Sequence, residues 1–172
     1  DAIVGGAIPN QFIPAVEKGV RQVLEQGAIA GYALHDVEVT LYDGKFHPVD
    51  SKEIAFSTAG RRAFLDAVSK AGPIILEPIV KIRIESPAAA MGDLTGDLSS
   101  KRGRVSGSKV DATGRVIISG EVPLAELENY ASRLKSLTAG EGHYSIEFSC
   151  YEQVPANVQK DLAAKFAAPE VD

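Results

Sequence analysis

Apolar residues recur at helical spacing over two stretches of the first 75 residues, which predicts two helices there. The first helix begins near Pro14 and ends near Gly27, because proline suits a first helical turn and glycine the position just past a helix end. The second begins near Asp50, whose side chain is the expected N-cap with Glu53 as its capping-box partner, and it runs to Lys70.

Between these two helices the apolar period changes to two. Val37, Val39 and Leu41 alternate with polar residues, so residues 34–42 are predicted to form a half-buried strand. This change of period indicates a mixed α+β unit in the first half of the chain.

The loop after this strand consists of Asp43, Gly44, Lys45, Phe46, His47 and Pro48. A proline biases the residue before it toward extended backbone, so we expect a comparatively stiff loop tip. A cation, an aromatic ring and an imidazole stand in a row here, a set that suits contact with the backbone and bases of RNA. An ordinary exposed loop is the alternative.

The second half of the chain carries strand and helix signals in the order βαββαβ, followed by a terminal helix. Period-two alternation begins near Leu76, a hairpin turns at 111–114, a helix opens at Pro123, and a last strand follows over 143–150. This order is typical of the ferredoxin-like arrangement. We therefore predict an α+β protein of two domains, 1–76 and 77–172.

The helix after Ser86-Pro87 contains two unusual features. Gly92 and Gly96 lie on one helix face, where each costs ~1 kcal/mol relative to alanine. They indicate a close backbone approach, either to the helix's own sheet or neighbouring domain or to another molecule. The helix ends in a cluster of cations, Lys101, Arg102 and Arg104. These residues either complement the helix dipole or form a local phosphate contact.

Charge and composition exclude several classes of protein. The formal net charge of -5 excludes a nucleic-acid coat protein, so any contact with nucleic acid must be a local patch. No apolar run approaches the ~18 residues of a membrane span. One cysteine excludes an internal disulfide and a tetrathiolate metal site. The chain begins at Asp1 and carries no GxxxxGK[ST] loop, so it is expected to be a piece of something longer.

No motif in the sequence indicates a catalytic centre. His35 and His143 occupy polar positions of predicted strands, where a solvated role is usual. Cys150 falls on the apolar face of its strand and is expected to be a buried structural thiol. We predict no catalytic residue, cofactor or metal in this chain.

Several short motifs occur in a fixed order across nearly all of the chain. They are Gly5–Pro9 with 12–16, Asp36–Gly44 with His47, 49–51 and 55–56, Leu76–Ile79, Met91–Asp93 with 96–98 and 102–103, and Val122–Glu126. In these motifs the chain resembles the C-terminal part of bacterial elongation factor G, the translocation GTPase. The resemblance implies that 1–76 is similar to domain IV, a module like the second domain of ribosomal protein S5 and incomplete at its N-terminus. It implies that 77–172 is similar to the ferredoxin-like domain V.

The resemblance also implies a function. The loop at 43–48 would be a tip that enters the decoding centre of the small ribosomal subunit as tRNA and mRNA move. Domain V, with Lys101, Arg102 and Arg104, would contact RNA in the factor-binding region of the large subunit. The parent would be a cytoplasmic, monomeric GTPase with no membrane partner, and its GTP and magnesium would be held in a preceding domain.

The sequence also departs from the family pattern. Lys45 and Phe46 stand where the family often has a small residue and tyrosine, Pro48 follows the histidine, and the Arg61-Arg62 pair is unusual within its helix. These departures leave open whether the parent performs translocation, recycling, or ribosomal protection of the tetracycline-resistance type. A hypothesis from another class is a regulatory domain that binds a small molecule at the edge of its ferredoxin-like sheet.

Overall fold

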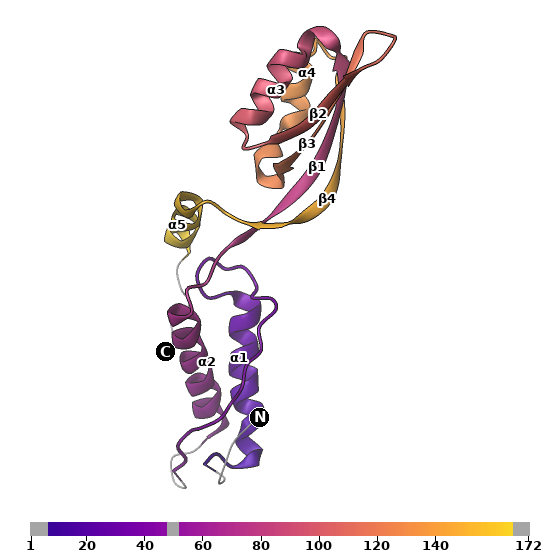
Figure 1. Ribbon diagram of the computed structural model, residues 1–172. Coiled ribbons are helices and arrows are strands. Elements are labelled where there is room, and N and C mark those ends of the chain that lie inside the picture. The colour runs from indigo at the N-terminus through magenta and orange to yellow at the C-terminus, as the bar shows by residue number, and fades with distance from the viewer. Residues whose placement is uncertain (1–6, 48–51, 167–172) are drawn as a thin grey trace. The chain divides into compact units, whose positions relative to one another are not determined.

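The computed structural model describes residues 7–47 and 52–166, and its contacts divide the chain into two units (Figure 1). The helical unit is Asp1–Ile75 together with Pro155–Asp172, and the sheet unit is Leu76–Val154. This division differs from the predicted one at the C-terminus, because α5 (Ala156–Lys165) groups with the helical unit. The Gln159 side chain accepts from the Ile75 amide at 3.1 Å and donates to the Pro73 carbonyl at 3.1 Å, which explains the grouping.

The helical unit is built on a short 3-10 turn, η1 (Asn10–Phe12), and two long helices, α1 (Ile13–Gln26) and α2 (Glu53–Lys70). Gly27 ends α1 with φ 79°, a positive-φ backbone conformation that glycine adopts at low cost. The predicted cap of α2 at Asp50 is wrong. The N-cap position is Lys52, without a side-chain cap bond, and Asp50 itself lies outside the described residues.

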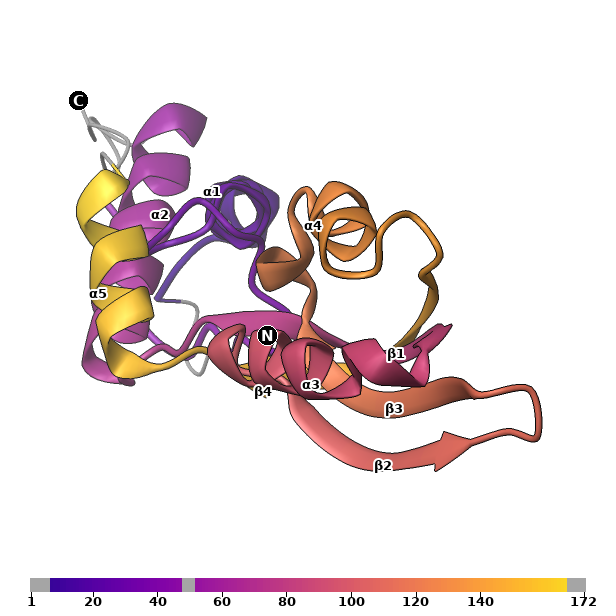
Figure 2. The same ribbon diagram turned by 90° about the horizontal axis from the view of Figure 1, so that it is seen from above.

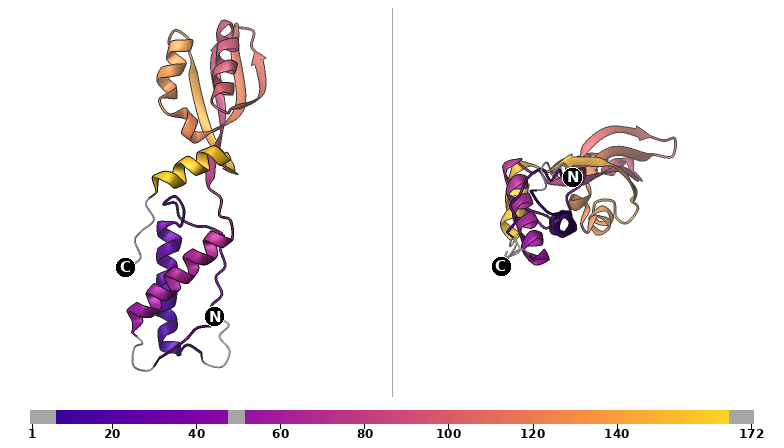
Figure 3. Two further views of the ribbon diagram at one scale, coloured as in Figure 1. Left: turned by 90° about the vertical axis from the view of Figure 1, so that its left-hand side faces the viewer. Right: turned by 90° about the horizontal axis from the view of Figure 1, so that it is seen from below.

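The helices α1 and α2 cross in close contact (Figure 3). A Cβ atom on Gly19 would overlap the Ser57 carbonyl oxygen, and one on Gly60 would lie 2.9 Å from the Val16 carbonyl oxygen. Glycine is therefore required at both positions for the two backbones to approach. Two small apolar clusters complete this packing, one containing Phe12 and Phe56 and the other Val23, Phe64 and Val68.

The strand predicted over residues 34–42 is wrong. These residues belong to no sheet, since the described residues of the helical unit contain no strand to pair with them. Asp36 also adopts φ 56°, which interrupts an extended backbone. Val37 and Val39 are consequently 44% and 42% exposed, whereas Leu41 packs against the Phe12 cluster.

The sheet unit confirms the predicted ferredoxin-like arrangement. Its strands are β1 (Leu76–Pro87), β2 (Arg104–Val110), β3 (Arg115–Pro123) and β4 (His143–Gln153), all paired antiparallel in the order β2-β3-β1-β4. The helices α3 (Met91–Ser100) and α4 (Tyr130–Leu137) lie against the same face of this sheet (Figure 1). The β2–β3 hairpin extends beyond both helices (Figure 2), and all of β2 is exposed.

The core of the sheet unit lies between the sheet and the two helices. Its most buried members are Ile82, Ile84, Leu94, Leu98, Val116, Ile118, Val122, Tyr130 and Leu134. In the register of β1, Ile82 and Ile84 face the helices, and Lys81 and Arg83 point to the other face. The alternation predicted from the sequence is thus the one that the sheet uses.

Two details of the sheet unit differ from prediction. The single helix predicted from Pro123 is two pieces, η3 (Leu124–Leu127) and α4, because Asn129 takes a left-handed conformation with φ 57° and Tyr130 then enters the core. Cys150 is only partly buried.

Gly92 and Gly96 have no packing explanation within the part of the chain that the structure describes. A Cβ atom on either glycine would meet nothing within 4 Å, so α3 is not drawn onto its own sheet through them. Both glycines instead lie on the exposed face of the helix. The close approach predicted to the helix's own sheet is therefore wrong for the described residues of the sheet unit.

Among the described residues, no helix is both long and apolar enough to cross a membrane.

Candidate nucleic-acid interface

The segment 43–47 is held against the helical unit by two contacts. The first is made by the backbone of Gly44, where a Cβ atom would overlap the end of the Ile8 side chain. Asp43 adds a local restraint, because its Oδ1 accepts from the Gly44 amide at 2.7 Å. Ile8 is itself buried in the Phe12 cluster, so the segment begins on a fixed base.

The second contact is aromatic. The Phe46 ring lies 5.9 Å from the Phe12 ring, centroid to centroid, and Phe12 stacks on Phe56 at 4.5 Å. Phe46 is therefore an anchor of the loop, with 36% of its surface left exposed. This differs from the sequence-based picture of a ring wholly available for stacking on a base.

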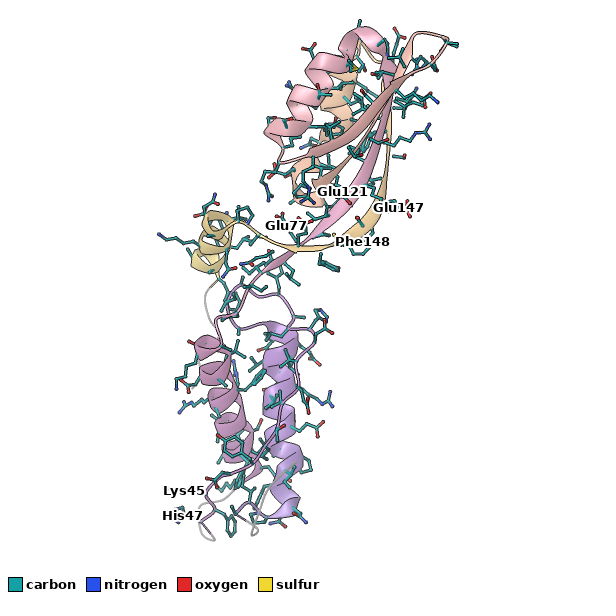
Figure 4. The ribbon with its side chains drawn as sticks, in the orientation of Figure 1. Lys45, His47, Glu77, Glu121, Glu147 and Phe148 are labelled. Carbon is teal, nitrogen blue, oxygen red and sulfur yellow. The ribbon has the colours of Figure 1, made fainter. Side chains whose placement is uncertain are left out.

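Lys45 and His47 alternate with these anchors and are exposed (Figure 4). They lie at the end of the helical unit where α1 and α2 begin. In an extended segment, successive side chains point to opposite sides. Gly44 and Phe46 face the unit, so Lys45 and His47 face outward. Pro48, the last residue of the predicted tip, lies outside the described residues.

The second predicted site, the cation cluster at the end of α3, is surrounded by carboxylates. Arg102 donates from Nη1 to Glu77 Oε1 at 2.6 Å, from Nη2 to Glu77 Oε2 at 2.9 Å, and from Nε to Glu126 Oε1 at 2.9 Å. The hydrogen bond to Glu77, with a smaller contribution from Glu126, raises the pKa of Arg102 further above its usual value. The guanidinium is thus permanently charged and directed inward.

The other two cations also have partners in the same unit. Arg104 Nη2 donates to Glu152 Oε1 at 2.6 Å and lies 3.4 Å from Glu121 Oε2. These carboxylates, Glu152 first, raise the pKa of Arg104. Lys101 Nζ donates to the Glu126 carbonyl oxygen at 3.1 Å.

The electrostatic consequence is that the cluster is not a basic patch by itself. Its three cations lie among four carboxylates, which are Glu77, Glu121, Glu126 and Glu152. The formal charge of this group is therefore -1. A phosphate would have to compete with an intramolecular carboxylate for each arginine, most of all for Arg102.

The backbone supports the same interpretation of Arg102. It adopts φ 57° just after α3, the left-handed position that a glycine usually fills at a helix end. The Gly103 amide donates to the Leu98 carbonyl at 2.8 Å and the Arg102 amide to the Ser99 carbonyl at 3.2 Å, as in a Schellman motif. An arginine is held in this conformation by three charged hydrogen bonds.

Sequence reasoning missed the carboxylate partners of these cations. Glu77 lies 25 residues before Arg102, and Glu152 lies 48 residues after Arg104. No local spacing joins them, because the sheet brings them together. Only the predicted position of Glu77 at the start of a strand indicated that this carboxylate could lie near a residue distant in sequence.

The two histidines considered for catalysis lie in different units, and both are exposed. The exposure of His143 follows its predicted strand position, whereas His35 lies outside any strand. Within the described ranges, no group of three histidine, cysteine or acidic residues is arranged to hold a metal ion.

Two sequence families match the chain. The family described as Elongation factor G, domain IV, matches residues 1–84, and the family described as Elongation factor G C-terminus matches residues 74–162. The second match alone spans more than half of the 172 residues. The chain belongs to the elongation factor G family. It corresponds to domains IV and V of that translation elongation factor, as its motifs indicated.

A solved structure supports this assignment. The crystal structure of a protein from Thermus thermophilus matches 95% of this chain with a TM-score of 0.73 and 34% sequence identity. The match covers 25% of that protein's chain, so the present chain spans a quarter of its length.

Proposed function

We propose that this chain is the ribosome-engaging part of a translational GTPase that promotes the movement of tRNA and mRNA during elongation. Membership of the elongation factor G family supports the class of protein. The observation that carries the proposal is the segment 43–47, where Ile8 and Phe12 anchor Gly44 and Phe46 and leave Lys45 and His47 facing outward.

The proposed action is steric and electrostatic. A segment anchored at two points can occupy a site that tRNA leaves, because it loses little conformational entropy on entry. Lys45 would contact RNA phosphates, and the His47 imidazole would contact RNA phosphates or bases at the decoding centre of the small subunit. No bond is made or broken in this chain. GTP and magnesium would be held by a preceding domain of a cytoplasmic, monomeric parent.

The contact with large-subunit RNA is proposed to use Lys101 and Arg104 at the rim of the sheet unit. Arg104 is 59% exposed at its side chain, so it can exchange a carboxylate for a phosphate. Arg102 is 31% exposed and doubly bonded to Glu77, and it acts as the positioning residue that fixes the end of α3.

The experiment compares Lys45→Gln and His47→Ala in the full-length protein with the matched control Lys70→Gln. Lys70 is an exposed lysine at the far end of α2, paired with Asp66 at 2.6 Å. We expect both loop variants to slow tRNA–mRNA movement in a single-turnover assay while ribosome-stimulated GTP hydrolysis stays normal. The control should change neither rate. Equal loss of movement and hydrolysis, or no loss of either, would contradict the proposal.

A further inference from the structure

A groove of about 690 Å³ lies between α1 and α2 in the helical unit. Its polar lining comes from Gln11, from Lys18 and Gln22 of α1, and from Glu53, Ser57, Thr58 and Arg61 of α2. Each wall of the groove therefore carries hydrogen-bond donors, and the α2 wall also carries one carboxylate. It is separate from the segment 43–47, none of whose residues line it.

The groove has a fixed shape because the two helices touch beside it. Gly19 and Gly60 bring the backbones into van der Waals contact, and Ser57, whose carbonyl faces Gly19, also lines the groove. The spacing of the two walls is set by this contact and not by flexible side chains. A ligand would thus meet a preformed site, which lowers the cost of binding.

The two cations of the groove lack the partners that neighbouring cations have. Arg21 pairs with Glu17 at 2.6 Å on α1, and Lys70 pairs with Asp66 on α2. Among the described residues, the side chains of Lys18 and Arg61 have no ion-pair or hydrogen-bond partner. The Arg61 Nε atom is, in addition, buried without an acceptor. A buried donor without an acceptor is unfavourable, and an acceptor supplied by a binding partner would satisfy it.

The chemistry of the lining selects an oxyanion. Lys18, Arg61 and Glu53 give the groove a formal charge of +1 in a chain of net charge -5. Hydroxyl and amide groups add neutral donors, and none of the described lining residues is an aromatic ring on which a base could stack. From Pro14 to Gln22 the α1 wall of the groove follows about 12 Å of helix at ~1.5 Å per residue, which is long enough for more than one phosphate of a strand.

We propose that the α1–α2 groove binds the phosphate backbone of an RNA segment, as a contact additional to the segment 43–47. This inference rests on the proposed function, because that function places the helical unit among ribosomal RNA and tRNA. Arg61 is one of the positions at which the sequence departs from the elongation factor G pattern. The groove contact is therefore argued from the residues of this chain and not from the family.

The test uses the 172-residue chain and the double variant Lys18→Gln/Arg61→Gln, with Lys70→Gln as a control for loss of a helix-surface cation. The probe is a fluorescein-labelled RNA hairpin, titrated by anisotropy over a series of salt concentrations. Loss of two phosphate contacts should reduce the slope of log affinity against log salt by about 1.4–1.8. The control should leave the slope unchanged. Circular dichroism checks that each variant is folded.

A second readout observes the groove directly. The Arg61 Nε–H resonance in an NMR spectrum of the wild-type chain should shift on addition of the hairpin, because the buried donor gains a phosphate acceptor. Inorganic pyrophosphate is titrated separately. Binding of pyrophosphate at Arg61 without a shift from the hairpin would assign the groove to a small phosphate ligand and overturn the RNA proposal.

The two proposals fail in distinguishable ways. An unchanged salt slope and an unmoved Arg61 resonance would overturn the groove contact while leaving the effects of the Lys45 and His47 variants on movement intact. If those loop variants had no effect but the groove variants reduced the slope, the translocation proposal would fail and the groove would remain an RNA contact.

Discussion

The Arg102 guanidinium and the Glu77 carboxylate meet end to end through two parallel hydrogen bonds, at 2.6 Å and 2.9 Å. The pair joins the end of α3 to the start of β1, and Glu77 is nearly buried with 10% of its side chain exposed. Two parallel bonds between a guanidinium and a carboxylate fix orientation as well as charge. Arg102 therefore holds the helix end in its left-handed turn and is not available as a simple RNA contact.

Replacing Arg102 should destabilise the sheet unit. Arg102→Gln leaves Glu77 almost buried without its cation, and breaking such a pair is costly because the remaining charge is desolvated. We expect a loss of about 2–4 kcal/mol, less than for a fully buried pair because Arg102 is about one-third exposed. Urea unfolding of the wild-type chain and the variant measures this loss in the free energy of unfolding.

The matched control is Arg104→Gln, whose exposed ion pairs should contribute little to the free energy of unfolding because solvent screens them. Arg102→Lys should recover only part of the loss, because lysine keeps the charge but not the two-pronged geometry. Equal stability of the Arg102→Gln and Arg104→Gln variants would show that the Glu77 pair does not hold the fold.

The exposed glycines of α3 should respond differently from the glycine at the crossing of α1 and α2. Gly92→Ala and Gly96→Ala should each stabilise the chain by about 1 kcal/mol, because helix propensity improves and the new methyl group meets nothing within 4 Å. Thermal unfolding of the single variants measures the gain.

Gly19→Ala is the contrasting variant. Its methyl group would overlap the Ser57 carbonyl, so the helices must separate at a cost of about 1–3 kcal/mol despite better helix propensity. A gain in stability for Gly19→Ala, or a loss for Gly92→Ala, would contradict the packing described for that helix. Gly92→Ala and Gly96→Ala can then be assayed on ribosomes without a stability defect.

Tyr130 should make the chain sensitive to alkaline pH. Burial, with a smaller effect of Asp97, raises the pKa of its hydroxyl to about 12 from an ordinary 10. Between these values the unfolded state loses the proton before the folded state does. The free energy of unfolding should therefore fall as pH rises from 10 to 12, by up to ~2–3 kcal/mol.

Tyr130→Phe is the control for that pH dependence. The hydroxyl is buried and has no hydrogen-bond partner among the described residues, so its removal should be neutral or stabilising near pH 7. Urea unfolding of both proteins from pH 8 to 11.5 separates this effect from lysine titration, which both share. If the free energy of unfolding fell with pH equally in wild type and Tyr130→Phe, the raised pKa of Tyr130 would not be the cause.

The sheet unit could be predicted from sequence because its signals are local. Period-two alternation in β1 and β4, a hairpin turn at Asp111 and a helix between strands fix the βαββαβ order, and hydrophobic burial then leaves one sheet topology. The split at Asn129 was missed because a left-handed residue leaves no trace in apolar spacing. The helix is interrupted at Asn129 because this places the Tyr130 side chain in the core.

The helical unit was harder to predict. The period of Val37, Val39 and Leu41 indicates an extended chain, but a strand also needs a hydrogen-bonded neighbour, and none lies among the described residues. The candidate sites likewise include features that follow from local sequence and features that do not. Exposure of Lys45 and His47 follows from a loop position, whereas the carboxylates around Arg102 and the groove beside Arg61 depend on contacts between distant segments.

The most direct test of the central claim locates the segment 43–47 on the ribosome. Cys150 is the one cysteine of the chain, so Cys150→Ser allows a single new cysteine to carry an iron chelate that cleaves nearby RNA through hydroxyl radicals. In the full-length protein without other cysteines, Lys45→Cys should direct cleavage to small-subunit RNA at the decoding centre. Lys70→Cys, at the other end of α2, should not. The same cleavage from both positions, or none from position 45 on ribosomes that bind the protein, would contradict the account.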